Sequence, residues 1–289
     1  MFKYIKYEIK GAYKFILGII LTILVSSTGI QLYARSMLNK FSNLNDGNMG
    51  AATPTLLVII LMLIIFGAFI TAFFYIVGAF KKELYEDRGY LTFSLPLTGR
   101  QILGSKLIVA LMWSALLFLS ALIYNLIVGS LLFGTEWMEG LKYLFSLDIG
   151  HIILTVVIYS IFSVIITFLL IYLSMTLSRV TIRNKKIGGL WFILFLVLNA
   201  LVSYGTFKAV EIIPYYLDLS SFKIIGESVI SNTIGNSNMY IMSPGTDMGM
   251  IMSSAGEMVV NIGSLLFSIL VAIGTFLGTS YLIEKKIDI

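Results

Sequence analysis

The most strongly charged stretch of this sequence lies between two apolar runs and holds its main candidates for chemistry. Residues 81–106 read KKELYEDRGYLTFSLPLTGRQILGSK and carry eight charged side chains in 26 positions. Both signs are present, and Tyr85, Tyr90 and Phe93 stand among them. Aromatic residues and arginine are enriched at protein interfaces, so the stretch suits the docking of another protein. The simpler alternative is a solvated connection, which is the usual role of a charge run.

The sequence lacks the residues that a nucleotide-binding loop or a metal site needs. The segment Gly99–Lys106, GRQILGSK, has two glycines at P-loop spacing, but its serine and lysine stand in reversed order. A P-loop requires lysine directly after the second glycine for the phosphates, and then a hydroxyl for Mg²⁺. The chain has no cysteine and one histidine, His151, so a thiolate or histidine cluster cannot form. We therefore expect no catalytic residue, metal or cofactor in this chain.

The composition is that of an integral membrane protein. Hydrophobic residues make up 58% of the 289 positions and charged residues 12%, with a mean hydropathy of +0.95. Soluble domains carry about 25% charged residues. The net charge of +5 is explained by basic residues at a membrane surface, so we expect no nucleic-acid partner.

Six apolar runs reach or approach the roughly 20 residues that a spanning helix needs. The first is the weakest because Ser26, Ser27 and Thr28 interrupt it, although hydroxyl groups can bond back to the helix backbone. The runs lie near Phe15–Tyr33, Thr55–Phe80, Leu107–Leu132, Ile152–Leu177, Leu190–Phe207 and Met258–Ile283.

The cores of these runs contain no Asp, Glu, Lys, Arg or His. Their most polar members are hydroxyl residues and Asn125, Asn199 and Asn261, which are the candidates for a substrate path. Intramembrane enzymes and proton-coupled transporters ordinarily place ionisable groups at membrane depth. We therefore expect a protein that is not an enzyme, and any uphill transport must draw its energy from another chain.

The basic residues predict the orientation of the spans. With the N-terminus inside, the cytoplasmic segments hold 15 of the 20 lysines and arginines, which places both termini and the stretch 81–106 in the cytoplasm. The outer segments carry nine carboxylates against five cations. The cytoplasmic basic residues are Lys3, Lys6, Lys10, Lys14, Lys81, Lys82, Arg88, Arg100, Lys106, Arg179, Arg183, Lys185, Lys186, Lys285 and Lys286.

Two segments outside the runs have patterns of their own. Residues 1–14 place apolar residues and lysines on two neighbouring helical stripes, which predicts an amphipathic helix in the headgroup region. A signal peptide is disfavoured because the leader holds Glu8 and lacks an A-x-A-like site. The outer segment 208–257 is predicted to form short re-entrant or interfacial helices, with Phe222, Ile225 and Val229 on one helical face, and then a mobile loop.

The stretch 81–106 has a predicted shape as well. Lys81–Ser94 can continue the second span as a polar helix, and Leu95-Pro96 ends it because proline disfavours helix at the preceding residue. Thr98 and Gln101 form a T-x-x-Q capping box directly before the third run. The pattern indicates a helix, a sharp turn and a newly capped helix at the membrane surface.

Taken over its whole length, the chain resembles the membrane subunit of type-2 ATP-binding-cassette (ABC) exporters. Their loop between spans two and three has an acidic-x-x-Gly element, a Leu-Pro pair, and a glycine and lysine that open span three. Here these elements read Glu86–Gly89, Leu95-Pro96 and Gly104-Ser105-Lys106. The N-terminal interfacial helix, the six spans and the long outer segment before the last span match the same architecture.

The resemblance implies an all-α integral membrane fold, a single permease domain over residues 1–289 in a bacterial plasma membrane. Its loop would hold a coupling helix that docks on a separate ABC ATPase, which binds ATP and Mg²⁺. A second permease copy or a homologous permease and membrane lipids complete the expected partners. The ATPase-coupling residues are expected to be Glu83, Tyr85, Glu86, Asp87, Arg88, Tyr90, Pro96 and Arg100.

The function implied is export of an amphipathic or hydrophobic substrate, such as an antimicrobial peptide, a drug or a lipid. A lining of apolar side chains with a few amides and hydroxyls cannot compensate the desolvation of a bare ion. An intramembrane enzyme and a non-transporting scaffold or sensor are the alternatives. Gly274 and Gly278 form a GxxxG pair in the last run, which within one chain more often serves internal packing than dimerisation.

Overall fold

The computed structural model describes residues 2–43, 52–85, 97–146, 150–181, 189–218, 223–226, 240–241, 250–252 and 258–285. The structure has six helices that are long and apolar enough to cross a membrane. Five of the predicted apolar runs lie within them, whereas the sixth, Met258–Ile283, starts with the strand Met258–Asn261 and is helical from Ile262. The chain is thus built as a multi-pass membrane protein. The helices are α1 (Phe2–Asn43), α2 (Ala52–Tyr85), α4 (Gly99–Ser146), α5 (Gly150–Thr181), α6 (Leu190–Ile212) and α8 (Ile262–Lys285).

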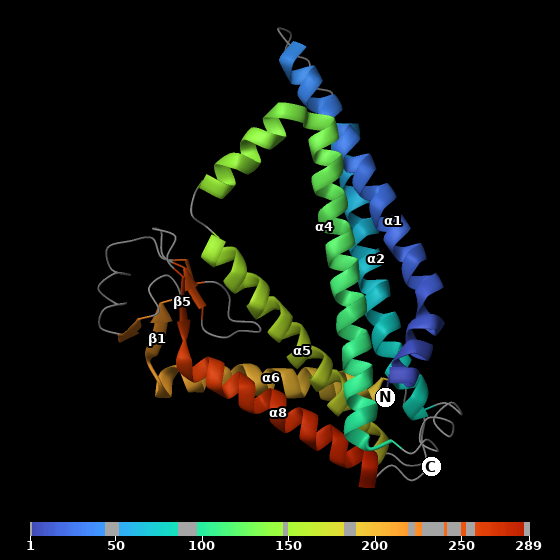
Figure 1. Cartoon of the computed structure of the whole chain (residues 1–289), viewed down its shortest axis with the longest axis vertical. Coiled ribbons are helices and arrows are strands. Elements are labelled where there is room, and N and C mark those ends of the chain that lie inside the picture. The colour runs from blue at the N-terminus through green and yellow to red at the C-terminus, as the bar shows by residue number, and fades with distance from the viewer. Residues whose placement is uncertain are drawn as a thin grey trace. The chain divides into compact units, whose positions relative to one another are not determined.

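The chain divides into two compact units, which are described separately. The first unit comprises residues 1–79 and 108–146, so it contains α1, most of α2 and most of α4. These helices lie side by side (Figure 1). The rings of Phe15 and Tyr75 stack with centroids 4.1 Å apart, and a Cβ on Gly29 would lie 3.1 Å from Cδ1 of Leu61. Both contacts join α1 to α2.

Helix α1 is continuous, and the boundary predicted at residue 14 is not a helix boundary. The structure has one helix of 42 residues from Phe2 to Asn43, and the described residues 2–14 form its beginning rather than a separate element. The hydroxyl residues of the first apolar run do not interrupt it either. Thr28 Oγ1 donates to the carbonyl of Leu24 at 2.6 Å, and this confirms the predicted back-bonding.

Helix α4 contains a sharp bend at Gly134, the residue with φ 57° and ψ −126°. Such a conformation favours glycine because it has no Cβ. Beyond the bend, the ring of Trp137 packs on Gly129, where a Cβ would lie 2.8 Å from Cε2 of the indole. The third span therefore ends near the predicted position, and α4 turns back beyond it (Figure 1).

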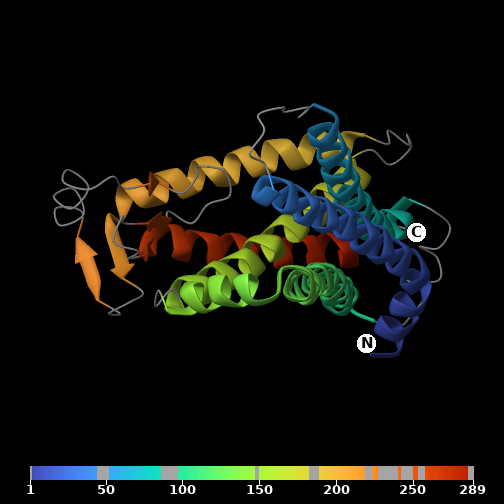
Figure 2. The same ribbon diagram turned by 90° about the horizontal axis from the view of Figure 1, so that it is seen from above.

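The second unit comprises residues 80–107 and 147–289, and its body is formed by α5, α6 and α8. Each of these three helices contacts the other two, and α6 and α8 run alongside each other (Figure 2). Two glycines permit close contacts between α6 and α8. A Cβ on Gly205 would collide with the ring of Phe267, and one on Gly263 would lie 2.5 Å from the carbonyl oxygen of Ala209.

The GxxxG pair of the last span has no such role in the described part of the chain. A Cβ built on Gly274 or on Gly278 has no atom within 4 Å among the described residues. The interpretation of this pair as an internal packing motif is therefore not supported.

An antiparallel sheet corrects the prediction for the outer segment. Strands β1 (Tyr215–Asp218), β2 (Ile224–Gly226), β3 (Tyr240–Ile241), β4 (Met250–Met252) and β5 (Met258–Asn261) are arranged in the order β2-β1-β5-β4-β3. The sheet lies where α6 ends and α8 begins (Figures 1 and 2).

The predicted helix around Phe222–Val229 was wrong, because residues 224–226 pair with β1 as a strand. Of the three residues assigned to its apolar face, only Ile225 lies among the described residues, where it packs against buried Tyr216 and Val259. The fold is therefore helical with one small sheet rather than all-α. The predicted mobile loop falls largely outside the described residues.

Candidate functional site

A buried ion pair joins the two ends of the charged stretch 81–106. Lys106 Nζ, in the second turn of α4, lies 2.5 Å from Oε1 of Glu83, near the end of α2. The two side chains are only 4% and 8% exposed. Removing two charges from water costs several kcal/mol each, roughly, and only close pairing offsets that cost. The ends of α2 and α4 are therefore held together by a contact that tolerates little displacement.

Neighbouring contacts fix the end of α2 against α5. The hydroxyl of Tyr85 donates to the carbonyl of Met175 at 3.1 Å, and the guanidinium of Arg179 lies 5.8 Å from the centre of the Tyr85 ring. One turn earlier, the rings of Phe80 and Tyr172 pack with centroids 4.4 Å apart. Hydrogen-bonding, cation–π and ring contacts thus all bear on the last two turns of α2.

The beginning of α4 is fixed in turn. The predicted capping box is confirmed. The backbone N–H of Gln101 donates to Thr98 Oγ1 at 3.4 Å, and the backbone N–H of Thr98 donates to Gln101 Oε1 at 3.2 Å. A Cβ on Gly99 would lie 2.5 Å from the carbonyl oxygen of Ser280, so α4 meets α8 where only glycine fits. Ser105, fully buried, donates to the carbonyl of Ile102 at 2.7 Å.

We call this arrangement the junction, and define it by Glu83, Tyr85, Gly99 and Lys106 with their partners Met175 and Ser280. The junction brings together parts of α2, α4, α5 and α8 that are far apart in the sequence. Its two charged groups, Glu83 and Lys106, are buried and paired with each other.

The predicted coupling residues have different positions relative to the junction. Tyr85 contributes to it directly, and Arg100 is exposed in the first turn of α4. Glu83 is buried against Lys106, so its carboxylate is not a surface contact in the described structure. The remaining predicted residues, Glu86, Asp87, Arg88, Tyr90 and Pro96, lie outside the described residues.

Sequence reasoning missed Lys106 as the partner of Glu83. A signal for it exists, because the two charges lie just outside the predicted ends of consecutive apolar runs, Phe80 and Leu107. Opposite charges at the facing ends of two adjacent spans lie at one membrane depth, where they can pair. Met175 and Ser280 contribute backbone carbonyls, and no side-chain pattern could have indicated them.

Asn125, a predicted substrate-path residue, instead joins α1 to α4 in the first unit. Its Oδ1 accepts hydrogen bonds from Ser27 Oγ and from Gln31 Nε2, each at 2.6 Å, and its Nδ2 donates to the carbonyl of Ala121 at 2.8 Å. Beside it, the hydroxyls of Thr28 and Tyr124 lie 3.2 Å apart. The Asn125 side chain is thus occupied by contacts within the protein, and these contacts account for Ser27, Thr28 and Gln31 of the first run.

Asn125→Leu should weaken the contact between α1 and α4. Ser27 and Gln31 would lose their shared acceptor, and interhelical hydrogen bonds in membranes contribute about 0.6 kcal/mol on average and up to about 1.7 kcal/mol. We expect a loss of about 1–2 kcal/mol in the free energy of unfolding, measured by denaturant titration in detergent micelles. Ser130→Ala, which removes a hydroxyl bonded only within α4, is the control and should change little. An equal loss in both variants would contradict a specific role for Asn125.

Asn261 is also a structural residue. It is fully buried, its Nδ2 donates to the carbonyl of Ile213 at 2.9 Å, and its Oδ1 accepts from the amide of Ser264 at 2.8 Å. The second bond makes it the N-cap of α8. It does not line either of the pockets described below.

Asn199 alone among the three asparagines lines a polar cavity. The cavity lies between α5, α6 and α8 and has a volume of about 30 Å³, enough for one or two water molecules. That volume excludes a peptide or drug in this state of the protein. Its polar lining residues are Ser163, Thr167, Asn199, Ser203, Thr206 and Ser268.

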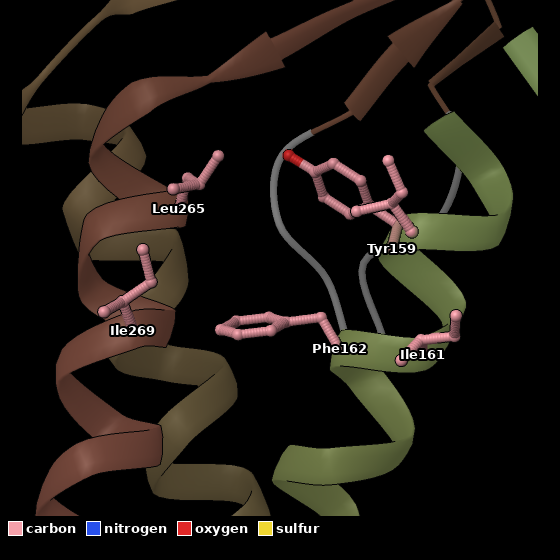
Figure 3. Close-up of a pocket in the computed structure, with 6 residues that line it drawn as sticks. Tyr159, Ile161, Phe162, Leu265 and Ile269 are labelled. Carbon is pink, nitrogen blue, oxygen red and sulfur yellow. The ribbon is translucent and has the colours of Figure 1, made fainter. Parts of the chain in front are cut away.

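A larger and almost wholly apolar groove lies between α5 and α8 (Figure 3). Its volume is about 350 Å³, and it is formed by Ile158, Tyr159, Ile161, Phe162, Leu265 and Ile269. In Figure 3 the rings of Tyr159 and Phe162 point from α5 toward Leu265 and Ile269 on α8. The three predicted substrate-path residues are thus distributed over separate places, and none of them lines this groove.

No group of three His, Cys, Asp or Glu side chains suited to a metal ion occurs within the described ranges. Comparison with protein-family models, with curated proteins and with solved structures gives no match. The function must therefore be inferred from the residues of this chain and their geometry.

Proposed function

We propose that the chain is the membrane-spanning permease subunit of an ABC exporter, driven by a separate ATPase subunit that binds ATP and Mg²⁺. It works with a second copy of itself or a homologous permease in a bacterial plasma membrane, with both termini in the cytoplasm. Six apolar helices of spanning length support this reading. So does the resemblance of the loop motifs at Glu86–Gly89, Leu95-Pro96 and Gly104–Lys106 to those of type-2 exporters.

The observation that carries the proposal is the junction at the base of the charged stretch. A coupling element transmits the motion of an ATPase only if its ends cannot move independently of the spans. The Glu83–Lys106 pair joins both ends of the stretch. Tyr85 donates a hydrogen bond to α5, and Gly99 permits close packing of α4 against α8. A solvated linker needs none of these contacts, so the junction favours a docking element over a passive loop.

Two finer features belong to the same proposal. Residues 1–14, with lysines at positions 3, 6, 10 and 14, form the part of α1 that lies along the cytoplasmic headgroups. The substrate is amphipathic or hydrophobic, in the class of antimicrobial peptides, drugs and lipids, because apolar spans with a few amides and hydroxyls cannot solvate a bare ion.

The test is to isolate the tagged chain from its native host in mild detergent and identify the proteins that remain bound. We expect a polypeptide with a complete Walker motif, whose ATP hydrolysis rises with a cationic amphipathic peptide and not with sodium chloride. The triple variant Glu86→Ala, Asp87→Ala, Arg88→Ala should lose this polypeptide, since losing a desolvated interfacial charge pair costs about 2–5 kcal/mol.

A matched control is available at the other end of the second unit. Lys208 and Glu211 form an exposed ion pair with side chains 45% and 49% exposed, so their double alanine variant also removes surface charges. It should keep the ATPase bound. If the triple variant retains full binding and stimulated hydrolysis, the stretch is a solvated loop and the proposal fails. An isolated chain that binds no ATPase would favour the scaffold alternative.

A further inference from the structure

The polar cavity between α5, α6 and α8 meets the requirements of a water site. Its volume is about 30 Å³, and one buried water needs about 10–15 Å³ together with two to four polar partners. Six of its lining residues carry a hydroxyl or an amide, and they come from all three helices. The apolar part of the lining is formed by Ile166, Leu170, Phe195 and Val202. The cavity is therefore both large enough and polar enough to hold water.

The threonines of this lining can accept hydrogen bonds from a bound molecule. Thr167 Oγ1 on α5 donates to the carbonyl of Ser163 at 2.9 Å, and Thr206 Oγ1 on α6 donates to the carbonyl of Val202 at 2.9 Å. A hydroxyl group has one proton and two lone pairs. Each threonine thus uses its proton on its own helix and keeps an oxygen that can accept.

Ser268 on α8 supplies the opposite capacity. The residue is only 4% exposed, and no hydrogen bond of its hydroxyl is seen in the described part of the chain. It lines the cavity together with the two threonines. A buried hydroxyl without a partner is costly, and such groups ordinarily bond to protein or to ordered water. Ser268 therefore has a proton to donate, and the cavity is the adjoining space that can hold its acceptor.

We propose that the cavity holds an ordered water that bridges the three helices. The water accepts a hydrogen bond from Ser268 Oγ and donates its two protons to Thr167 Oγ1 and Thr206 Oγ1. Three hydrogen bonds are the usual number for a buried water. The bridge also explains why hydroxyl groups gather at one place within three apolar helices, and it does not depend on the proposed transport function.

The chemistry of the lining favours water over an ion or an apolar molecule. No charged side chain is among the described residues that line the cavity, and neutral hydroxyls and amides cannot offset the desolvation of a bare ion. An apolar molecule would leave the hydroxyl of Ser268 without an acceptor. Water can both accept and donate within this volume.

The test is hydroxyl-radical footprinting of the full-length chain in detergent micelles, read by mass spectrometry. Radicals formed from an ordered internal water oxidise the side chains beside it, whereas side chains packed without water are protected. Leu170 lines the cavity and is 3% exposed, and its neighbour Leu169 is 2% exposed but does not line the cavity. We expect Leu170 to be oxidised and Leu169 to remain protected.

Two variants and one control separate the parts of the proposal. Ser268→Val removes the donor and adds a methyl group in the cavity, so it should lower the oxidation rate of Leu170 to that of Leu169. Thr206→Val removes one acceptor at nearly constant size and should lower the rate partway, which tests the bridge even if Ser268→Val unfolds. Thr275→Val should leave the rate unchanged, because the Thr275 hydroxyl bonds within α8 and the residue does not line the cavity.

Three results would overturn the inference. Protection of Leu170 equal to that of Leu169 in the unchanged protein would show that the cavity is dry. An unchanged oxidation rate of Leu170 in both Ser268→Val and Thr206→Val would show that these hydroxyls do not hold the water. An equal fall of that rate in Thr275→Val would attribute the effect to a general disturbance of α8 rather than to the cavity.

Discussion

Glu83→Met or Lys106→Met alone should lower the free energy of unfolding by about 3–5 kcal/mol, because each leaves one buried charge without its partner. The double variant Glu83→Met, Lys106→Met should lose far less. Replacing a buried ion pair by apolar residues of similar volume is often neutral or even stabilising by about 1–4 kcal/mol. Denaturant titration of the four proteins in detergent micelles measures the coupling between the two sites.

The reasoning depends on burial, so the control is an exposed pair. Lys208 Nζ lies 2.6 Å from Oε2 of Glu211, close to the 2.5 Å between Lys106 Nζ and Glu83 Oε1. The side chains of Lys208 and Glu211, however, are about half exposed. Surface pairs contribute about 0–1 kcal/mol, and Lys208→Met should cost no more than that. Equal losses of unfolding free energy in Lys106→Met and Lys208→Met would show that water reaches the junction. The Glu83–Lys106 pair would then contribute no more to stability than a surface pair.

The same double variant separates folding from coupling. If the junction serves only to hold α2 and α4 at a fixed separation, apolar side chains of similar size should preserve that separation. Under the proposed function, the double variant then retains the ATPase partner while each single variant loses it in proportion to its unfolding. A double variant that folds but cannot bind the partner would give the charges themselves a role in docking.

The parts of this molecule that could be predicted from its sequence are those fixed by local physical chemistry. An apolar run of spanning length has no stable alternative to a helix in a bilayer, because every backbone group must be bonded internally. Hence all six helices were expected. The capping box at Thr98 and Gln101 and the back-bonded hydroxyl of Thr28 depend on residues three or four positions apart, and both were found.

The parts that could not be predicted depend on partners distant in the sequence. Strand β1 pairs with β5, more than 40 residues later, and each strand has only four residues, too few to fix a period. The pairing of Tyr216 with Asn261 therefore could not be predicted from the residues of either strand. In the same way, Glu83 was assigned to the ATPase-coupling surface through the resemblance, whereas its partner in the structure is Lys106 on α4.

The three asparagines illustrate this limit most directly. All were assigned to a substrate path because an amide in an apolar run looks functional, and the sequence offers no means of distinguishing them. The structure gives Asn125 two donors on α1, gives Asn261 two backbone partners, and leaves Asn199 beside a small polar cavity. Their substitution should therefore have unequal consequences.

Asn261→Leu should be among the most damaging single changes in the second unit. The residue ends β5, caps α8 and bonds the carbonyl of Ile213 just beyond α6, so three elements meet at one buried side chain. Leucine would leave the partly buried carbonyl of Ile213 and the buried amide of Ser264 without these partners, at up to about 1–3 kcal/mol each. We expect a loss of about 2–5 kcal/mol in the free energy of unfolding.

A graded series makes the mechanism of that loss visible. The serine in Asn261→Ser keeps an oxygen that can cap α8, but its side chain is too short to reach the carbonyl of Ile213. Asn261→Ser should therefore lose about 1 kcal/mol less than Asn261→Leu, the contribution of the cap. Asn199→Leu is the matched control, because no hydrogen bond of its amide is seen in the described part of the chain and leucine would fill part of the cavity. It should change the free energy of unfolding by less than about 1 kcal/mol, as an apolar substitution away from a bonded polar group usually does. Should Asn199→Leu prove as harmful as Asn261→Leu, the loss would come from the apolar substitution itself, and the bonds to Ile213 and Ser264 would not be its cause.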